Sequence, residues 1–194
     1  MSAAQHYSRV AIALHWLIAL AIIGNLIGGL ALQWFFESDD PAMKARGLAI
    51  IGLHKSLGLT IILLTLLRIG WRLANPPPPL PAHMTMLERR LAGLSHGVFY
   101  VLMLVLPLSG WALASTGRGP ILWFGLSGVP RLPIAGTRRE LFGESHEILA
   151  WAMVALLALH LLAALKHHIL DRDDVVAGML PWVRRRHDAV IKRL

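Results

Sequence analysis

Four histidines lie in or beside one apolar stretch of the sequence, ESHEILAWAMVALLALHLLAALKHHI, residues 144–169. His146 stands near its start, His160 lies inside it, and His167 and His168 close it. An imidazole nitrogen can bind a metal, move a proton or form a hydrogen bond. Ionisable side chains are rare in hydrocarbon and are treated as functional by default. The chemistry of these rings therefore depends on which groups the rest of the chain places beside them.

The composition is typical of an integral membrane protein. Hydrophobic residues make up 56% of the 194 residues and charged residues only 15%, whereas a soluble domain has about 25% charged residues. The net charge of +8 comes from basic residues between apolar runs and near the C-terminus, a pattern that sets membrane topology rather than one that binds nucleic acid. No cysteine is present, which excludes disulfides, iron–sulfur clusters, covalently attached haem and thiolate zinc sites.

Four apolar stretches are long enough, or nearly so, to cross a bilayer as helices, which takes about 20 residues. We expect an all-α integral membrane four-helix bundle, a single domain over residues 1–194, with spans at approximately 10–36, 48–67, 91–114 and 146–168. A proline-rich linker, ANPPPPLPAH, joins the second and third spans. The long segment 116–145 is predicted to lie over the outer end as an interfacial lid, with Trp123 and Phe124 at headgroup depth.

The distribution of lysine and arginine predicts the orientation. Twelve of these residues fall on the side of the two termini and seven on the opposite side. The positive-inside rule therefore favours cytoplasmic N- and C-termini. The prediction is therefore a multi-pass membrane protein with both ends on the cytoplasmic side.

With this topology the histidines fall into two layers. His15 and His160 share the inner leaflet, and His54 and His146 share the outer leaflet. His146 and His160 are 14 residues apart, which is about four helical turns, so both project from nearly one face, about 21 Å apart along the helix. His96 also falls in the inner layer, and depth alone leaves open which two of the three inner histidines form a pair.

Two histidines without a nearby carboxylate or cysteine make a poor zinc site, because zinc takes four ligands, or three and a water. Two axial nitrogens do satisfy an iron whose other positions are filled by a porphyrin. The spacing therefore favours two b-type haems; the alternative is that the rings hydrogen bond between helices. Small residues near the histidines fit either a macrocycle or close helix packing; they are Gly24, Gly28, Gly29, Gly52 and Gly58.

The sequence resembles the bacterial cytochrome b561 family over nearly its whole length. The family consists of four-helix membrane cytochromes with two haems b. The resemblance rests on ALHWLIAL (13–20), IGLHKSLG (51–58), LRIGWRLANPPPPLP (67–81), LSHGVFYVLMLVLPLSGW (94–111), ESHEILAW (144–151) and LALHLLAALKHHILDRDDVVAGMLP (157–181). One departure is that Ala177 and Gly178 precede the Met-Leu-Pro ending, where members of the family commonly have a basic residue.

The resemblance implies which histidines bind iron. His15 and His160 are expected to ligate the inner haem, His54 and His146 the outer haem, and His96 to be a non-ligand. It also implies quinone chemistry at one end, with ubiquinone as electron acceptor or donor, and, as in some members, oxidation of superoxide at the outer haem.

Charged residues suggest where the substrates would meet the protein. Lys55 adjoins His54, and the outer lid has Arg118 and three further arginines, 131, 138 and 139. A cationic funnel would concentrate a small anion, although any of these arginines could instead anchor the lid. At the inner end, His167 is a candidate proton donor to quinone; the alternative for His167 and His168 is that they cap the helix. His6, His83 and His187 are predicted to be plain surface residues.

The sequence thus predicts an oxidoreductase that passes electrons from superoxide to ubiquinone through two stacked haems, and no protein partner is required. Two alternatives remain. The chain could be a cytochrome b subunit that relays electrons from a docked hydrogenase or dehydrogenase to quinone, or a non-catalytic haem-binding membrane protein.

Overall fold

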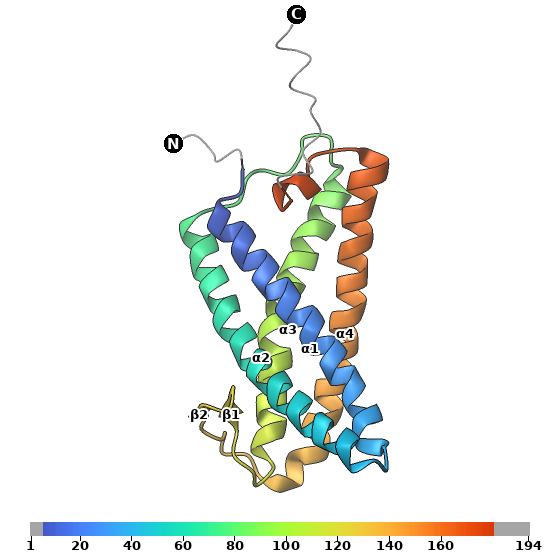
Figure 1. The fold of residues 1–194 in the computed structure, drawn as a ribbon. Coiled ribbons are helices and arrows are strands. Elements are labelled where there is room, and N and C mark those ends of the chain that lie inside the picture. Colours follow the sequence, from blue (N-terminus) through green and yellow to red (C-terminus); the bar gives the residue numbers. More distant parts are fainter. Residues whose placement is uncertain (1–5, 181–194) are drawn as a thin grey trace, which may run out of the picture.

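Four long helices form the molecule in a computed structural model, which describes residues 6–180 (Figure 1). They are α1 (Arg9–Glu37), α2 (Pro41–Ala74), α3 (Met86–Ser115) and α4 (Arg139–Lys166). All four are long and apolar enough to cross a membrane, so the predicted all-α membrane bundle is confirmed. Pro181 and His187, which entered the sequence predictions, lie outside the described residues.

The first three helices begin at polar caps that lie beyond the apolar stretches. Ser8 Oγ accepts a hydrogen bond from Ala11 N at 3.2 Å at the start of α1, and Asp40 caps α2 just before Pro41. At α3, Thr85 and Glu88 form a reciprocal capping box. Such side chains satisfy the backbone N–H groups that a helix start leaves unpaired. The helices consequently extend past the predicted spans; α2 covers 41–74 where apolar content predicted 48–67.

The segment predicted as an outer lid is partly helical. Its residues 139–145 form the first turns of α4, preceded by a 3₁₀ turn, Gly136–Arg138. The rest contains a short antiparallel hairpin of β1 (Leu122–Trp123) and β2 (Ser127–Gly128). Figure 1 shows this hairpin at the end of the bundle opposite the two termini. The apolar residues of this segment did not indicate where α4 begins: the fourth span was predicted from residue 146, whereas the helix begins at Arg139.

Three hydrogen bonds fasten the hairpin to α2, one of them from Ser56 Oγ to Leu122 O at 3.4 Å. Phe124 N donates to Ser56 Oγ at 2.9 Å, and Trp123 Nε1 donates to Thr60 Oγ1 at 3.1 Å. The turn needs unusual backbone angles, with φ of 51° at Phe124 and 72° at Gly125, a region that glycine adopts freely and other residues rarely. The hairpin is therefore held by side chains of α2 that lie two and six residues beyond His54.

The chain changes helical form where α4 ends. A π-helix, His167–Asp171, follows α4, and Arg172 then takes a left-handed conformation with φ 54°. A short 3₁₀ turn, Val176–Gly178, comes next. Trp16 Nε1 donates to Met179 O at 2.9 Å, so this C-terminal segment folds back over the start of α1.

The best-buried apolar side chains form a cluster in the bundle's interior: Ile18, Ile22, Ile61, Leu102, Met103 and Met153. In sequence they come from α1, α2, α3 and α4, between the inner and the outer histidines. Most other large apolar side chains are exposed, as expected where a membrane rather than water covers the protein. The buried cluster thus separates the two histidine layers.

The predicted orientation can be tested with cysteines, since the chain has none. The Ser127→Cys variant, in the exposed hairpin, should react with a membrane-impermeant maleimide in intact spheroplasts. The Ala82→Cys variant, in the exposed linker, should react only after lysis, because the linker lies at the same end of the bundle as the start of α1. Labelling of the linker but not of the hairpin in intact spheroplasts would show the opposite orientation.

Candidate functional site

Histidines from different helices meet in two places inside the bundle. The ring centroids of His54 on α2 and His146 on α4 are 6.0 Å apart, and those of His15 on α1 and His160 on α4 are 6.3 Å apart. The structure therefore brings together the partners that were predicted from depth. Because α4 carries one member of each pair, the pairs are stacked along its axis.

The outer pair is held by hydrogen bonds to backbone carbonyls. His54 Nδ1 lies 3.1 Å from Asn25 O, and His146 Nδ1 lies 3.2 Å from Leu106 O. A carbonyl oxygen can only accept, so each Nδ1 carries the proton. Ser109 Oγ, which donates to Leu106 O at 2.7 Å, also lies 2.9 Å from His146 Nδ1. Both Nε2 atoms are then unprotonated, which is the form that binds a metal.

Two glycines make room for these rings. A Cβ on Gly29 would lie 2.8 Å from Cε1 of His54, and a Cβ on Gly110 would lie 2.9 Å from Cε1 of His146. Both distances are shorter than carbon atoms tolerate. Gly29 was singled out in the sequence as a small residue, whereas Gly110 was missed; its only signal is its place one turn beyond Leu106 in α3.

The inner site has three imidazoles. His96 on α3 has its ring centroid 6.2 Å from that of His160, almost the same separation as His15. Phe99 packs edge-on against His160 with centroids 5.3 Å apart. Arg68 lies near enough to interact electrostatically with both His15 and His160. Distance alone therefore leaves the inner partner of His160 open, as depth did.

His54 and His146 are suited to hold a haem iron between them. A nitrogen ligand lies about 2 Å from such a metal and the ring centre roughly 1 Å behind it, so two opposed imidazoles have centroids about 6 Å apart. A cavity of about 600 Å³ is lined by both outer histidines, by Gly29 and Gly110, and otherwise mostly by apolar side chains. Cofactor pockets are of this size and character. Asn25 Oδ1, at the same cavity, is buried with no hydrogen-bond partner.

Of the residues predicted to meet a small anion, Lys55 lies at the cavity beside His54, and Arg139 lines it as well. Arg118 is exposed in the segment after α3 and is not among the lining residues. Arg131 donates to the carbonyls of Gly117 and Gly119, so it holds the lid together.

The candidate proton donor His167 lies in the π-helix after α4. Its Nδ1 is 2.7 Å from Asp173 Oδ2 and 3.2 Å from Asp171 Oδ2. His83, predicted to be a plain surface residue, also reaches Asp173 Oδ2, at 3.0 Å. Burial raises the pKa of Asp173, but the N–H of Val175 and the two imidazoles outweigh it and hold this pKa below its ordinary value.

Comparison with known proteins agrees with the fold. Residues 6–182 match the sequence profile of the family described as prokaryotic cytochrome b561. The chain belongs to this family. Cytochrome b561 proteins are membrane electron-transfer proteins with b-type haem, and the four spans agree with a multi-pass protein of the bacterial inner membrane.

Three relatives illustrate the match to the cytochrome b561 family. Cytochrome b561 homolog 2 of Escherichia coli (strain K12) is 34% identical over 91% of this chain and 92% of its own. A Yersinia pestis protein named "Probable superoxide oxidase CybB" is 30% identical over 93% of this chain and 98% of its own. Cytochrome b562 of Cereibacter sphaeroides is 28% identical over 90% of this chain and 94% of its own.

The close approach of Gly110 to His146 gives a testable prediction. Gly110→Ala should push the ring off its two hydrogen bonds and lower the haem content of the purified protein, measured as pyridine haemochrome per chain. Gly93→Ala is the matched control on the same helix, because a Cβ there meets nothing within 4 Å, and alanine stabilises a helix relative to glycine. Equal haem content in both variants would show that His146 does not need this space.

Proposed function

We propose that the chain binds two b-type haems, one at each histidine pair, and conducts electrons across the membrane. His54 and His146 would hold the outer haem, and His15 and His160 the inner one. A b-type haem bound at such a pair would accept and release single electrons. The chain's own part is to fix the ring planes, keep water out, and space the two sites along α4.

The main support for the proposal is the hydrogen bonding of His54 and His146, which leaves one ring nitrogen of each free of a proton. Both Nδ1 atoms are engaged by backbone carbonyls, so both Nε2 atoms are left to face a metal between rings 6.0 Å apart. Hydrogen bonding at the far nitrogen also makes an imidazole a more basic ligand. A histidine that only joined two helices would instead point its second nitrogen at a polar group.

The inner assignment rests on the family resemblance, since His15 and His96 are equally distant from His160. His96 hydrogen bonds to the backbone of Ala92 on its own helix. We assign it as a non-ligand that lies beside the inner haem.

A haem count tests the two assignments together. Pyridine haemochrome analysis should give two haems b per chain in the wild type and one in each of His146→Ala and His160→Ala. His96→Ala is the control for the inner layer and should retain two. One haem in His96→Ala and two in His15→Ala would show that His96, and not His15, is the second ligand of the inner haem. An unchanged haem count in His146→Ala would contradict the proposed outer haem.

We further propose that the electrons come from superoxide and go to ubiquinone. Two superoxide anions would give two dioxygen molecules and two electrons, and ubiquinone would take these electrons with two protons to become ubiquinol. Lys55 and Arg139 at the cavity, with Arg118 on the exposed lid, supply positive charge that attracts an anion. The name of the Yersinia pestis relative supports this choice of donor.

At the opposite end, His167 would deliver a proton to the quinone. It lies seven residues beyond His160 in the sequence, close to two helical turns, and its Nδ1 is tied to carboxylates. The Nε2 atom is then the one available to a substrate. A proton donor is needed at this end because a quinone takes up two protons when it is reduced by two electrons.

Superoxide-driven reduction of a ubiquinone analogue tests the donor. The second-order rate constant should fall severalfold in Lys55→Gln and Arg118→Gln and should decrease with salt, because screening weakens the attraction of an anion. Lys44→Gln, at the start of α2, is the charge-matched control. A rate that is unaffected by salt and by both substitutions would contradict the cationic funnel; no turnover in a protein with two haems would point to a different electron donor.

A further inference from the structure

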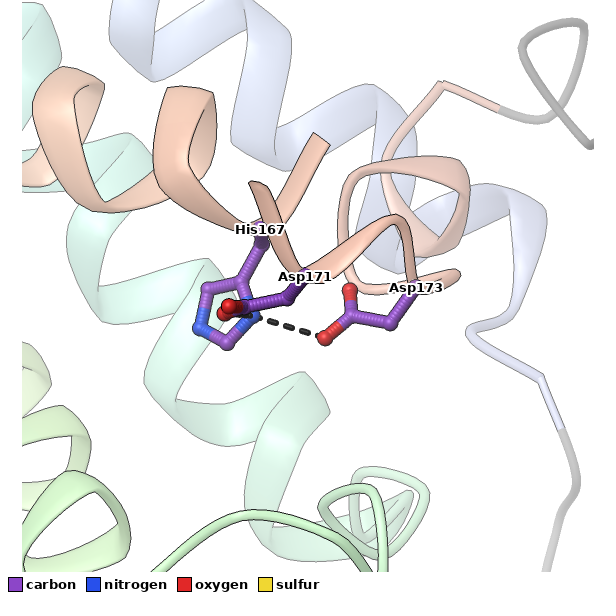
Figure 2. Close-up of side chains that lie close together, drawn as sticks. All are labelled: His167, Asp171 and Asp173. Carbon is purple, nitrogen blue, oxygen red and sulfur yellow. Dashed lines mark hydrogen bonds and ion pairs between the residues drawn. The ribbon is translucent and has the colours of Figure 1, made fainter. Parts of the chain in front are cut away.

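Four side chains that bind metals elsewhere in proteins converge at the termini end of the bundle. His167, Asp171 and Asp173 follow one another along the end of α4, and Figure 2 shows their ring and carboxylates turned toward one another. His83 joins them from the proline-rich linker between α2 and α3. This group, called here the His–Asp cluster, is separate from the histidine pairs inside the bundle.

We propose that the His–Asp cluster is a divalent-cation site of the zinc class. The ligand atoms would be His83 Nε2, His167 Nδ1 and one oxygen from each of Asp171 and Asp173. Two imidazoles and two carboxylates are a donor set that suits zinc and neighbouring transition metals rather than magnesium or calcium.

The spacing of the atoms fits such an ion. His167, Asp171 and Asp173 each offer one ligand atom, and these three atoms all lie within 4.8 Å of one another. The nitrogen is 2.7 and 3.2 Å from the two oxygens, and His83 Nε2 is 3.0 Å from Asp173 Oδ2. Ligands at about 2.0–2.1 Å from a tetrahedral zinc lie about 3.3 Å apart. These three nitrogen–oxygen distances differ from that value by only a few tenths of an ångström.

The backbone of residues 167–172 has an unusual conformation that brings the side chains of the cluster together. A π-helix is rare, and it occurs mostly as a single turn at functional sites; this one, His167–Asp171, begins and ends at two of the residues concerned. Arg172 then adopts φ 54°, which costs energy for a residue with a Cβ. The reversal brings Asp173 back to His167, whose carbonyl accepts from Asp173 N at 3.2 Å. Such strain at a residue is a reason to look for function.

Charge and burial favour a cation as well. Lys166 pairs with Asp171 and with Glu88, so the three carboxylates and one ammonium of this group have a formal charge of −2. Only 8% of the Asp173 side chain and 12% of the His167 side chain are exposed, and a carboxylate so placed needs a strong partner. When a metal binds Asp171, Lys166 keeps Glu88 at 3.0 Å.

The bound ion would fasten the linker to the end of α4. His83 is 55% exposed and comes from a different connection than the other three ligands, so it closes the site across the bundle. His167 would use Nδ1 for the metal and keep Nε2 for the proposed proton transfer.

Zinc uptake by the haem-loaded, tag-free protein tests the proposal. The protein is treated with a chelator and dialysed to equilibrium against Zn²⁺ with excess Mg²⁺, and zinc is then measured by elemental analysis. We expect the wild type to bind one more zinc per chain than the His167→Ala variant. Asp173→Asn and His83→Ala should weaken the zinc affinity about tenfold or more. Asp174→Asn removes the same charge one residue away and should leave the affinity unchanged. The haem spectrum of each variant checks that it is folded.

Zinc uptake that is equal in wild type, Asp173→Asn and His83→Ala would mean an adventitious ion only and would overturn the proposal. Displacement of zinc by Mg²⁺ would also overturn it, because it would show that the imidazoles are not ligands. Failure to take up zinc would leave a plain hydrogen-bonded cluster. Since binding is the readout, this test stands apart from the haem count and from turnover.

Discussion

The structure depends on one constraint, that a polar group in hydrocarbon needs a partner inside the protein. The outer imidazoles meet it by donating Nδ1–H to helix carbonyls, those of Asn25 and Leu106. Each carbonyl oxygen has a second lone pair, so the contact costs the helix little. The bonds fix the position and the protonation of each ring at once. The glycines, the cavity and the approach of the helices all follow from accommodating rings that are held in this way.

The apolar cluster between the histidine layers serves the same constraint. Met153 is 1% exposed and packs with Ile61 and Leu102 in the middle of the bundle. Side chains of this kind offer nothing for water to bind, so they keep protons and ions from crossing the middle of the bundle. Charged groups are instead found at the two ends, where the membrane surface provides water.

The sequence was sufficient to predict the helices and the layers, because both depend on local periodicity and on counting residues along an axis. It could not give the ends of α2 or the start of α4, since those depend on caps such as Asp40 and on a 3₁₀ turn that carries no apolar signal. The importance of Gly110 was also hidden, because it depends on a ring from another helix. His83 looked like a surface residue for a related reason: its partner, Asp173, lies 90 residues away, and only a π-helix and a left-handed arginine bring the two together.

Helix α4 contributes a histidine to both pairs, and it follows the other three long helices of residues 6–180 in the sequence. During synthesis the first three helices emerge without it, and at that stage neither His54 nor His15 has the partner that the finished bundle provides. Assembly of the two sites is thus deferred to the insertion of one final helix. A chain that stops before α4 keeps the bond between His54 and Asn25 O but has neither histidine pair, so it has no place for an ion between two rings.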